Sequence, residues 1–447
     1  MNFRTGFSSW SDFDTESRPL SELRGSGFAH GALVLTFDPK TATPPIAAML
    51  SIEAAKAMAW TEEGDSETGA HIQYCEILSP EVATGFPAYE AIPSWNTRTG
   101  KGSWATIELS ALIGGIWSPW HDHGVWSTGN TPVASSSIVA SHSIVASSSS
   151  GASTTSRPLP PSGALLSPEA GRDESGRVST DTLILSRPAE AFRLRVRLFA
   201  RGAGEPPRLE ALSLAWSSSK PALVRPTSEC GLKGRWIEGV PAWSQMIYPD
   251  GGKVWCSPTS LSMVMAYWIA RDGGRRPDEE SFIRRTVAGV YDGAYGGHGN
   301  WSFNAAWAGE LGFFASVRRF AALSELETFI AAGQPVILSV SWDKDGGRPL
   351  SGAPVARSTG HLTTLLGFDA KGDPVMNEPA APDDASVRLV YRRDELEARW
   401  LEASGGAAYI LKAGPFREPG LGSGHRPGLG SGYGQGHGRK GPDGASA

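Results

Sequence analysis

The segment AFRLRVRLFA at residues 191–200 alternates strictly between apolar and charged side chains over most of its length. Successive side chains of a β-strand point to opposite faces, so this alternation predicts a strand with one buried face and one solvated face. Similar short runs occur at 30–37, 103–112 and 181–186, separated by stretches rich in Gly, Pro and Ser. Such spacing is typical of antiparallel sheets. The sequence therefore predicts a β-sandwich in its first half.

The pattern changes after about residue 230, where apolar residues recur at helical spacing. The segment 257–270 predicts an amphipathic helix. Its apolar face consists of Leu261, Val264, Met265, Trp268 and Ile269. Residues 323–333 predict a second helix that ends at Gly333 and runs into the apolar strand 335–342. Helices that precede their strands favour an α+β domain.

Two low-complexity stretches mark the boundaries of this organisation. Residues 127–163 are rich in Ser and contain a near-repeat, and they predict a mobile insert within a β-sandwich-like domain at 1–225. Residues 415–447 repeat PGLGSG and predict a disordered tail. The α+β domain is expected between them, at 226–414.

Composition excludes several classes of partner. The 447 residues carry 41 Lys and Arg against 46 Asp and Glu, a net charge of −5, with no basic stripe for nucleic acid. No stretch reaches the roughly 18 apolar residues that a membrane-spanning helix needs. The first twenty residues lack the apolar core of a signal peptide. We therefore expect a soluble protein of uncertain localisation whose oligomeric state the sequence does not indicate.

Cys256 is the residue that most strongly suggests chemistry. It precedes Ser257 and Pro258, and Pro suits the first turn of a helix because the N–H it lacks would have no intrahelical acceptor there. A thiol at a helix N-terminus is biased toward the thiolate, which is the form that attacks carbonyl groups. A buried cysteine that only fills space is the alternative interpretation. Three cysteines cannot all pair within one chain, so at least one thiol stays free or bonds to another molecule.

A base and an orienting group are available further along the chain. His361 begins an apolar strand, and the segment 360–379 predicts a hairpin whose second strand carries Asn377 and Glu378. Nucleophile, base and orienting group form the triad of covalent catalysis. Adjacent strand residues face opposite sides, so an odd-length loop would place Asn377 beside His361 and an even-length loop would place Glu378 there. The sequence alone leaves both open.

Gln245 could supply the fourth function of such a site. Acyl transfer needs a donor for the oxyanion of the transition state, and a side-chain amide is of the right type. Gln245 lies shortly before Cys256 in the segment VPAWSQM. A solvent-facing loop glutamine is the alternative.

These segments resemble a known family. VPAWSQM, WCSPTSLSMVMAYW and GHLTTLLGFDAKGDPVMNEPAAPD are similar to the peptidase C39-like family, particularly its actinobacterial branch, over about Val240 to Leu411. The upstream segment IPSWNTRTGKGSWATIEL resembles the sandwich-like N-terminal region that such proteins often carry. The resemblance implies a papain-like cysteine peptidase fold and a peptide or protein substrate. Relatives are commonly extracellular, whereas the first twenty residues here lack a signal peptide, so the resemblance leaves localisation open.

Carried over residue by residue, the resemblance implies Cys256 as nucleophile, His361 as base and Gln245 as oxyanion donor, with no metal or organic cofactor. The family usually has Asn-Asp-Pro where this chain has Asn377-Glu378-Pro379. We favour Asn377 as the orienting residue, because an amide oxygen can accept the imidazole proton as in papain-like enzymes. If the acidic position orients instead, the longer Glu378 must reach His361 in an altered geometry.

Two other functions are consistent with the sequence. The 16 tryptophans and the Glu378 departure would suit a surface or carbohydrate-binding protein with a decayed catalytic domain. The same triad could instead transfer the acyl group to an amine, as in a cross-linking or ligating enzyme.

Three minor features have weaker interpretations. The segment HDHG at 121–124 could supply two metal ligands, but a solvated turn is favoured because a structural zinc normally takes four. The segment HGN at 298–300 could border the cleft or form a Gly-rich loop with an aromatic anchor. Cys75 and Cys230 could form a disulfide in an exported protein.

Overall fold

The computed structural model describes residues 3–11, 26–29, 32–35, 63–64, 71–128, 172–201, 207–218 and 227–414. Apart from Ser127 and Thr128, the Ser-rich insert expected at 127–163 lies outside these residues, and so does the tail expected at 415–447. None of the described helices is long and apolar enough to cross a bilayer.

The described residues of the first half of the chain form an antiparallel sheet of twelve strands with the order β2-β3-β12-β6-β11-β5-β4, extended by further strands that pair with β7, β11 and β12. Its strands are β1 (Thr5–Ser11), β2 (Ser26–Ala29), β3 (Ala32–Leu35), β4 (Glu63–Gly64), β5 (His71–Leu78), β6 (Val82–Arg98), β7 (Ser103–Ile113), β8 (Ile116–Trp117), β9 (His121–Trp126), β10 (Gly176–Ser179), β11 (Thr182–Arg201) and β12 (Arg208–Ser217). The strands expected at 30–37, 103–112, 181–186 and 191–200 are all present within it.

The longest strand, β11, connects different parts of this sheet. Leu183–Phe192 pairs with β6, with register shifts between Ile184 and Ala191, and Ala191–Ala200 pairs with β7 without a shift. Strands that change partner at a bulge allow one sheet to fold over a core. The four apolar residues expected to face that core are fully buried. They are Phe192, Leu194, Val196 and Leu198.

The opposite face of β11 is less solvated than the alternation predicted. Arg195 binds Glu108 at 2.7 Å, and Arg197 binds Glu76 at 2.8 Å. The guanidinium of Arg195 also lies 4.3 Å from the centroid of the Trp120 ring. Arg195 and Arg197 are therefore paired with carboxylates, and Arg195 is also covered by an aromatic ring rather than by water.

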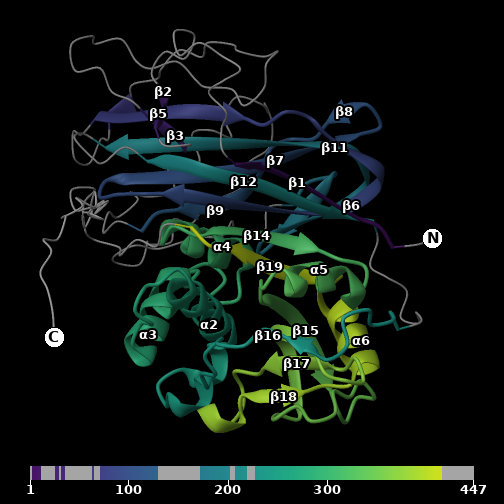
Figure 1. The fold of residues 1–447 in the computed structure, drawn as a ribbon. Coiled ribbons are helices and arrows are strands. Elements are labelled where there is room, and N and C mark those ends of the chain that lie inside the picture. The colour runs from purple at the N-terminus through teal and green to yellow at the C-terminus, as the bar shows by residue number, and fades with distance from the viewer. Residues whose placement is uncertain are drawn as a thin grey trace, which may run out of the picture.

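The second half of the chain forms an antiparallel sheet of seven strands with the order β14-β19-β15-β16-β17-β18, and β13 pairs with β16. These strands are β13 (Arg235–Trp236), β14 (Phe314–Arg319), β15 (Val336–Asp343), β16 (Arg357–Phe368), β17 (Pro374–Asn377), β18 (Arg388–Val390) and β19 (Ala407–Lys412). The helices are η2 (Gln245–Ile247), η3 (Gly252–Val254), α2 (Cys256–Arg271), α3 (Glu279–Val290), α4 (Trp301–Glu310), η4 (Leu323–Leu326), α5 (Glu327–Ala331), η5 (Asp384–Ser386) and α6 (Arg393–Ser404). Figure 1 shows α2 and α3 on one side of this sheet and α6 on the other.

The helix expected at 257–270 is α2, but it is not amphipathic in its setting. Every residue from Ser257 to Ile269 is buried. A helix surrounded by protein on all sides is a central element rather than a surface one. The helix expected at 323–333 begins as the 3₁₀ turn η4, continues as α5, and ends before Gly333, whose φ of 73° suits glycine.

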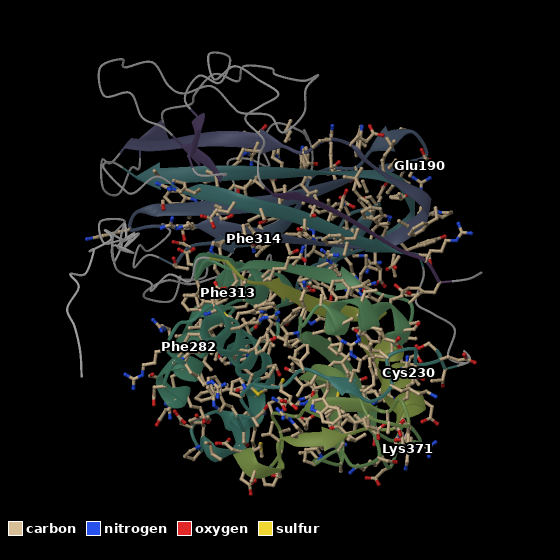
Figure 2. All side chains as sticks on the ribbon, in the orientation of Figure 1. Glu190, Cys230, Phe282, Phe313, Phe314 and Lys371 are labelled. Atoms are coloured by element: carbon tan, nitrogen blue, oxygen red, sulfur yellow. The ribbon has the colours of Figure 1, made fainter. Side chains whose placement is uncertain are left out.

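The two halves of the chain share one hydrophobic core. Phe303 of α4 packs against Trp95 and Trp126 of the first sheet, with ring centroids 6.0 and 5.7 Å apart. At the other side of the contact Arg319 of β14 pairs with the buried Glu90 of β6. Figures 1 and 2 show α4, β14 and the neighbouring Phe313 and Phe314 along the boundary between the two halves. The second half is therefore supported directly by the first.

Candidate active site

Cys256 is the first residue of α2, as the sequence predicts, and its side chain is partly exposed. No side chain caps this helix at Trp255. The amide hydrogens of a first helical turn have no intrahelical acceptors, and together with the helix dipole they favour negative charge. Ser260, one turn further along, donates to the carbonyl of Leu362 at 3.1 Å and so joins α2 to β16.

His361 lies on β16 and is only 4% exposed. Its Nε2 is 2.5 Å from Oε1 of Glu378. The ring of Trp342 meets the imidazole edge-on, with centroids 5.1 Å apart. Because Nε2 is occupied by Glu378, Nδ1 is the ring nitrogen left for the sulfur of Cys256.

Glu378 is fully buried, and both of its carboxylate oxygens accept hydrogen bonds. The hydroxyl of Tyr391 donates to its Oε2 at 2.9 Å, and the N–H of Ala380 donates to its Oε1 at 2.9 Å. Burial raises the pKa of this carboxyl. The charge of His361 and the hydrogen bonds together lower the pKa by more than burial raises it, so the net shift is downward. Glu378 is therefore an anion that can hold a protonated imidazole.

The electrostatics of Cys256 and His361 favour an ion pair. Burial raises the pKa of the Cys256 thiol, whereas the charge of His361, its hydrogen bond and the N–H of Leu362 lower it, with a net downward shift. Burial lowers the pKa of His361, but Glu378 and Cys256 raise it to about 10. Both shifts favour a thiolate beside an imidazolium.

Our preference for Asn377 as the orienting residue is wrong, because its side chain faces away from His361. Its Nδ2 donates to the carbonyl of Pro241 at 2.7 Å, and its Oδ1 accepts from Arg388 at 3.3 Å. Asn377 thus ties the hairpin to the segment before Gln245. The longer Glu378 reaches the imidazole without difficulty.

A bulge in β16 decides which of the two residues meets His361. The hairpin loop at 369–373 has an odd number of residues, which by itself would place Asn377 on the His361 side. The register shifts by one residue between Leu365 and Gly367, which reverses that parity. Gly367 has φ 155°, and a Cβ there would lie 2.3 Å from the carbonyl oxygen of Arg235. Only glycine fits at this point of the bulge.

Gln245 is buried, at 2% exposure, rather than facing solvent. Its Nε2 donates to the carbonyl of Gly252 at 2.5 Å, and its backbone N–H donates to the carbonyl of Pro379 at 2.8 Å. These bonds connect it to the segment that leads into Cys256 and to the residue after Glu378. One hydrogen of the Nε2 amide remains after the bond to Gly252.

Several residues around the site were missed by the sequence analysis. Ser257 donates to Oδ1 of Asn304 at 2.8 Å and contacts the hydroxyl of Tyr409 at 3.0 Å. Trp342 contacts His361, and Tyr391 donates to Glu378. No signal in a single sequence pairs these residues with Cys256, because each comes from a separate helix, strand or loop. Only the adjacency of Ser257 to the cysteine could have suggested its role.

The expected solvated turn at 121–124 is wrong, because these residues begin β9. His121 and His123 are 6% and 1% exposed. Burial, and then the charge of His121, lowers the pKa of His123 to about 3. Within the described part of the chain, no three His, Cys, Asp or Glu side chains gather as metal ligands would.

The segment 298–300 leads into α4 and anchors it. Asn300 caps the helix by accepting from the N–H of Phe303 at 3.1 Å, and its Nδ2 donates to Asp292 at 2.9 Å. Phe303 is the aromatic anchor in the shared core. The loop interpretation of this segment therefore fits its structure.

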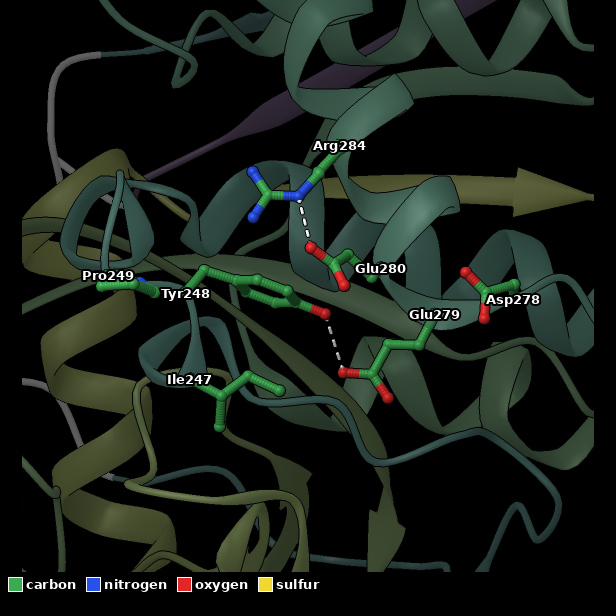
Figure 3. Close-up of a pocket in the computed structure, with 7 residues that line it drawn as sticks. All are labelled: Ile247, Tyr248, Pro249, Asp278, Glu279, Glu280 and Arg284. Atoms are coloured by element: carbon green, nitrogen blue, oxygen red, sulfur yellow. Dashed lines mark hydrogen bonds and ion pairs between the residues drawn. The ribbon is translucent and has the colours of Figure 1, made fainter.

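A surface pocket of about 350 Å³ lies beside η2 and the start of α3 (Figure 3). It is lined by Ile247, Tyr248, Pro249, Asp278, Glu279, Glu280 and Arg284. Tyr248 donates to Glu279 at 3.0 Å, and burial raises the pKa of Glu279 to about 7. None of the candidate catalytic side chains lines this pocket, so it is separate from the Cys256 site.

Cys230 is a second free thiol, so the Cys75–Cys230 disulfide considered above is absent. Burial raises the pKa of Cys230, in the opposite direction to that of Cys256. Figure 2 labels Cys230 on the α6 side of the second half of the chain, away from α2. The reactivity of Cys256 can therefore be compared with that of Cys230 in the same protein.

Comparison with known families places this geometry in context. Residues 237–408 match the Peptidase_C39 like family, and residues 38–143 match the Peptidase C39 N-terminal domain. Residues 237–408 are therefore similar to the peptidase C39-like family. This similarity supports a peptidase-like function for residues 237–408, called the C39-like region below, which follow an N-terminal β region.

A crystal structure described as a C39-like peptidase from Bacillus anthracis is 17% identical to this chain. The match covers 41% of this chain and 100% of the other chain, with a TM-score of 0.30. We draw no structural conclusion from so low a score. A comparison with curated proteins gave no match.

Proposed function

We propose that this protein is a cysteine peptidase that hydrolyses peptide bonds with Cys256 as nucleophile, His361 as acid and base, and Glu378 as the orienting group. The proposal rests on two consecutive contacts: the Cys256 thiol at the start of α2 bonds the imidazole of His361, and that imidazole bonds the buried carboxylate of Glu378. The three groups come from the start of α2, from β16 and from the residue that follows β17. Their opposite pKa shifts are those that a nucleophilic thiolate requires.

The reaction would proceed through a thioester. The Cys256 thiolate attacks the substrate carbonyl, and the resulting oxyanion accepts hydrogen bonds from the remaining Nε2 hydrogen of Gln245 and from amides at the start of α2. The His361 imidazolium gives its proton to the leaving amine as the C–N bond breaks. Neutral His361 then takes a proton from water, whose oxygen attacks the thioester and releases the acid product and the thiolate.

The proposal extends to the fold and its boundaries. A papain-like fold is supported by a helix that presents the cysteine to a sheet that presents the histidine. A boundary near 225–226 is supported by the first sheet ending at Ser217 and the second beginning at Arg235. The first-half assembly is proposed to be a β-sandwich, because β11 and β6 change partners around a buried core.

The structure gives little support to the alternative of a carbohydrate-binding or surface protein with a decayed catalytic domain. Glu378 makes a short bond to His361, so its departure from the usual aspartate does not disconnect the triad. Large aromatic side chains are needed in the core rather than for a ligand. Trp95, Trp104, Trp126, Trp342 and Trp400 are all fully buried.

The test is a comparison of peptide products from wild type and Cys256→Ala incubated with the same denatured proteome. We expect new N-termini only with the wild type, each formed by addition of water. Products that carry an added amine when one is supplied would instead indicate transfer. No new termini at any pH between 5 and 9 would contradict the proposal.

A further inference from the structure

Helix α4 connects the N-terminal β region to the Cys256 helix. Figure 1 shows it at the boundary between the two halves of the chain. From the β region, Asp181 accepts from the backbone N–H of Trp301 at 2.6 Å, and the carbonyl of Pro93 accepts from Ser302 at 2.6 Å. The first two residues of α4 are therefore held by the first sheet.

The other face of α4 holds α2. Oδ1 of Asn304 accepts from Ser257, and Nδ2 of Asn304 donates to the carbonyls of His298 and Asn300 at 2.9 and 2.8 Å. Ser257 is the neighbour of Cys256. A displacement at the start of α4 would therefore be passed through one side chain to the residue that follows the nucleophile.

Asp181 is held for this contact by an unusual turn. The N–H of Asp181 donates to the carbonyl of Ser179 at 2.8 Å around Thr180, which has φ 59°. A γ-turn with positive φ is rare and strained, and a β-branched residue makes it more so. Strain of this kind persists where the surrounding structure requires the conformation. Here it presents Asp181, which is 5% exposed, to Trp301.

The charges of Asp181 and Cys256 act on the same two phenols. Burial raises the pKa of the Tyr409 phenol, and the charges of Asp181 and Cys256 both raise it further, although the hydrogen bond between Tyr409 and Ser257 opposes them. The same two charges raise the pKa of Tyr295 after burial does. The Asp181 carboxylate of the β region and the Cys256 thiolate of the C39-like region therefore raise the pKa of the same two phenols, Tyr295 and Tyr409.

We propose that Asp181 of the N-terminal β region is a positioning residue of the Cys256 site, acting through the start of α4 and the Asn304–Ser257 bond. The inference rests on the proposed function, since it assigns to the β region a part in holding the nucleophile. It makes the first sheet a component of the active site rather than an independent module.

The test uses the full chain and measures iodoacetamide alkylation of Cys256 against pH, with Cys230 as the internal reference. In Asp181→Ala we expect the Cys256 rate at pH 6.5 to fall roughly 10-fold and its profile to shift to higher pH, because a small misplacement at a reacting group has a large effect. Asp181→Asn can still accept from Trp301 and should stay within about twofold of wild type. Asp122→Asn changes another partly buried carboxyl of the β region, which bonds Gly124, and should leave the profile unchanged.

A second pair of variants tests the hydrogen bond itself, in case Asp181→Ala does not fold. Trp301→Pro removes the donor N–H at a helix position that accepts proline, and the preceding Asn300 already has the extended backbone that proline requires. Trp301→Ala removes the same side chain but keeps the N–H. We expect the upward shift in Trp301→Pro and not in Trp301→Ala.

The outcomes separate the two proposals. A normal wild-type profile that stays the same in Asp181→Ala, or in Trp301→Pro relative to Trp301→Ala, overturns this inference alone, even if the melting temperature falls. A wild-type Cys256 that reacts no faster than Cys230 at pH 6.5 overturns the proposed function and this inference with it.

Discussion

The carboxylate of Glu378 sets the charge state of the site at the scale of single residues. Glu378→Gln keeps the shape but removes the anion beside His361, so the pKa of His361 should fall. The charge of Glu378 also raises the pKa of Cys256 slightly, but the loss of the larger influence of the imidazolium should make that pKa rise overall. An opposite charge at this range is worth about 1–3 pKa units. The midpoint of the Cys256 alkylation profile should move upward by about that amount.

Asn377→Ala is the matched control on the neighbouring residue. It removes the bond to Pro241 and leaves a buried carbonyl unpaired, which should lower the free energy of unfolding by about 1–3 kcal/mol. The alkylation profile of the folded protein should stay where it is in wild type. If Asn377→Ala moved the profile and Glu378→Gln did not, the assignment of the orienting group would be reversed.

The candidate nucleophile and base could be predicted from the sequence, but the third group could not. Cys256 precedes a helix start signal, and His361 begins an apolar strand, so both have local signatures. The choice between Asn377 and Glu378 depends on strand parity, which one extra residue in β16 inverts. Nothing in the sequence marks that bulge except Gly367, and a glycine in a strand has several explanations.

At the scale of elements, the hairpin of β16 and β17 is held in register by Gly367. Gly367→Ala would drive a Cβ against the backbone of β13 and strain the positive φ, so the bulge should be lost or displaced. We expect a loss of about 1–3 kcal/mol in the free energy of unfolding, measured by urea denaturation. The Cys256 alkylation profile should shift upward as Glu378 leaves the imidazole.

Gly360→Ala is the control on the same strand. Gly360 is exposed, directly precedes His361, and has open space where a Cβ would stand. Its substitution should change neither stability nor the profile noticeably. Equal effects of the two substitutions would show that the bulge has no special part in aligning the triad.

Element types were more predictable than their surroundings. Four strand segments of the first sheet, and the helix, strand and hairpin of the C39-like region, follow directly from periodicity and turn residues. The burial of α2 on all sides does not, because its Ser257, Thr259, Ser260 and Ser262 resemble a solvent face in sequence. They are buried because α4, β16 and β19 surround them.

At the scale of the whole molecule, the shared core predicts that stability depends on carboxyls at the boundary. Glu310 of α4 accepts from the N–H of Thr99 at 3.2 Å and from Trp126 at 3.5 Å. Burial is the largest influence and raises the pKa of Glu310 to about 7, against the hydrogen bonds that lower it. The folded protein thus binds this proton more tightly than the unfolded chain does.

The sign of the pH dependence follows from linkage. A carboxyl with a raised pKa in the folded state makes the free energy of unfolding increase as the pH falls from about 7 toward 4.5. Glu310→Gln should therefore flatten the dependence of the melting temperature on pH between 5 and 7. The exposed Glu190 of β11 provides the control Glu190→Gln, which should leave the slope unchanged.

The sequence divides the chain into two domains but does not reveal that they form one core. Asn96 donates to the carbonyl of Ala315 at 3.0 Å and accepts from the N–H of the same residue at 3.1 Å. Such contacts join segments more than two hundred residues apart, and no local pattern pairs them. The structure makes the two halves depend on each other, which the Asp181 proposal extends to the active site.

The most direct measurement of the central claim is the rate of Cys256 alkylation by iodoacetamide in the wild type from pH 5 to 10, with Cys230 as the reference. A thiolate held by His361 and Glu378 should react at pH 6 at least about 10-fold faster than Cys230, with a rate that changes little up to neutral pH. If the two cysteines instead rise together with pH, each as an ordinary thiol with a pKa of about 8.5 or above, Cys256 is not an activated nucleophile.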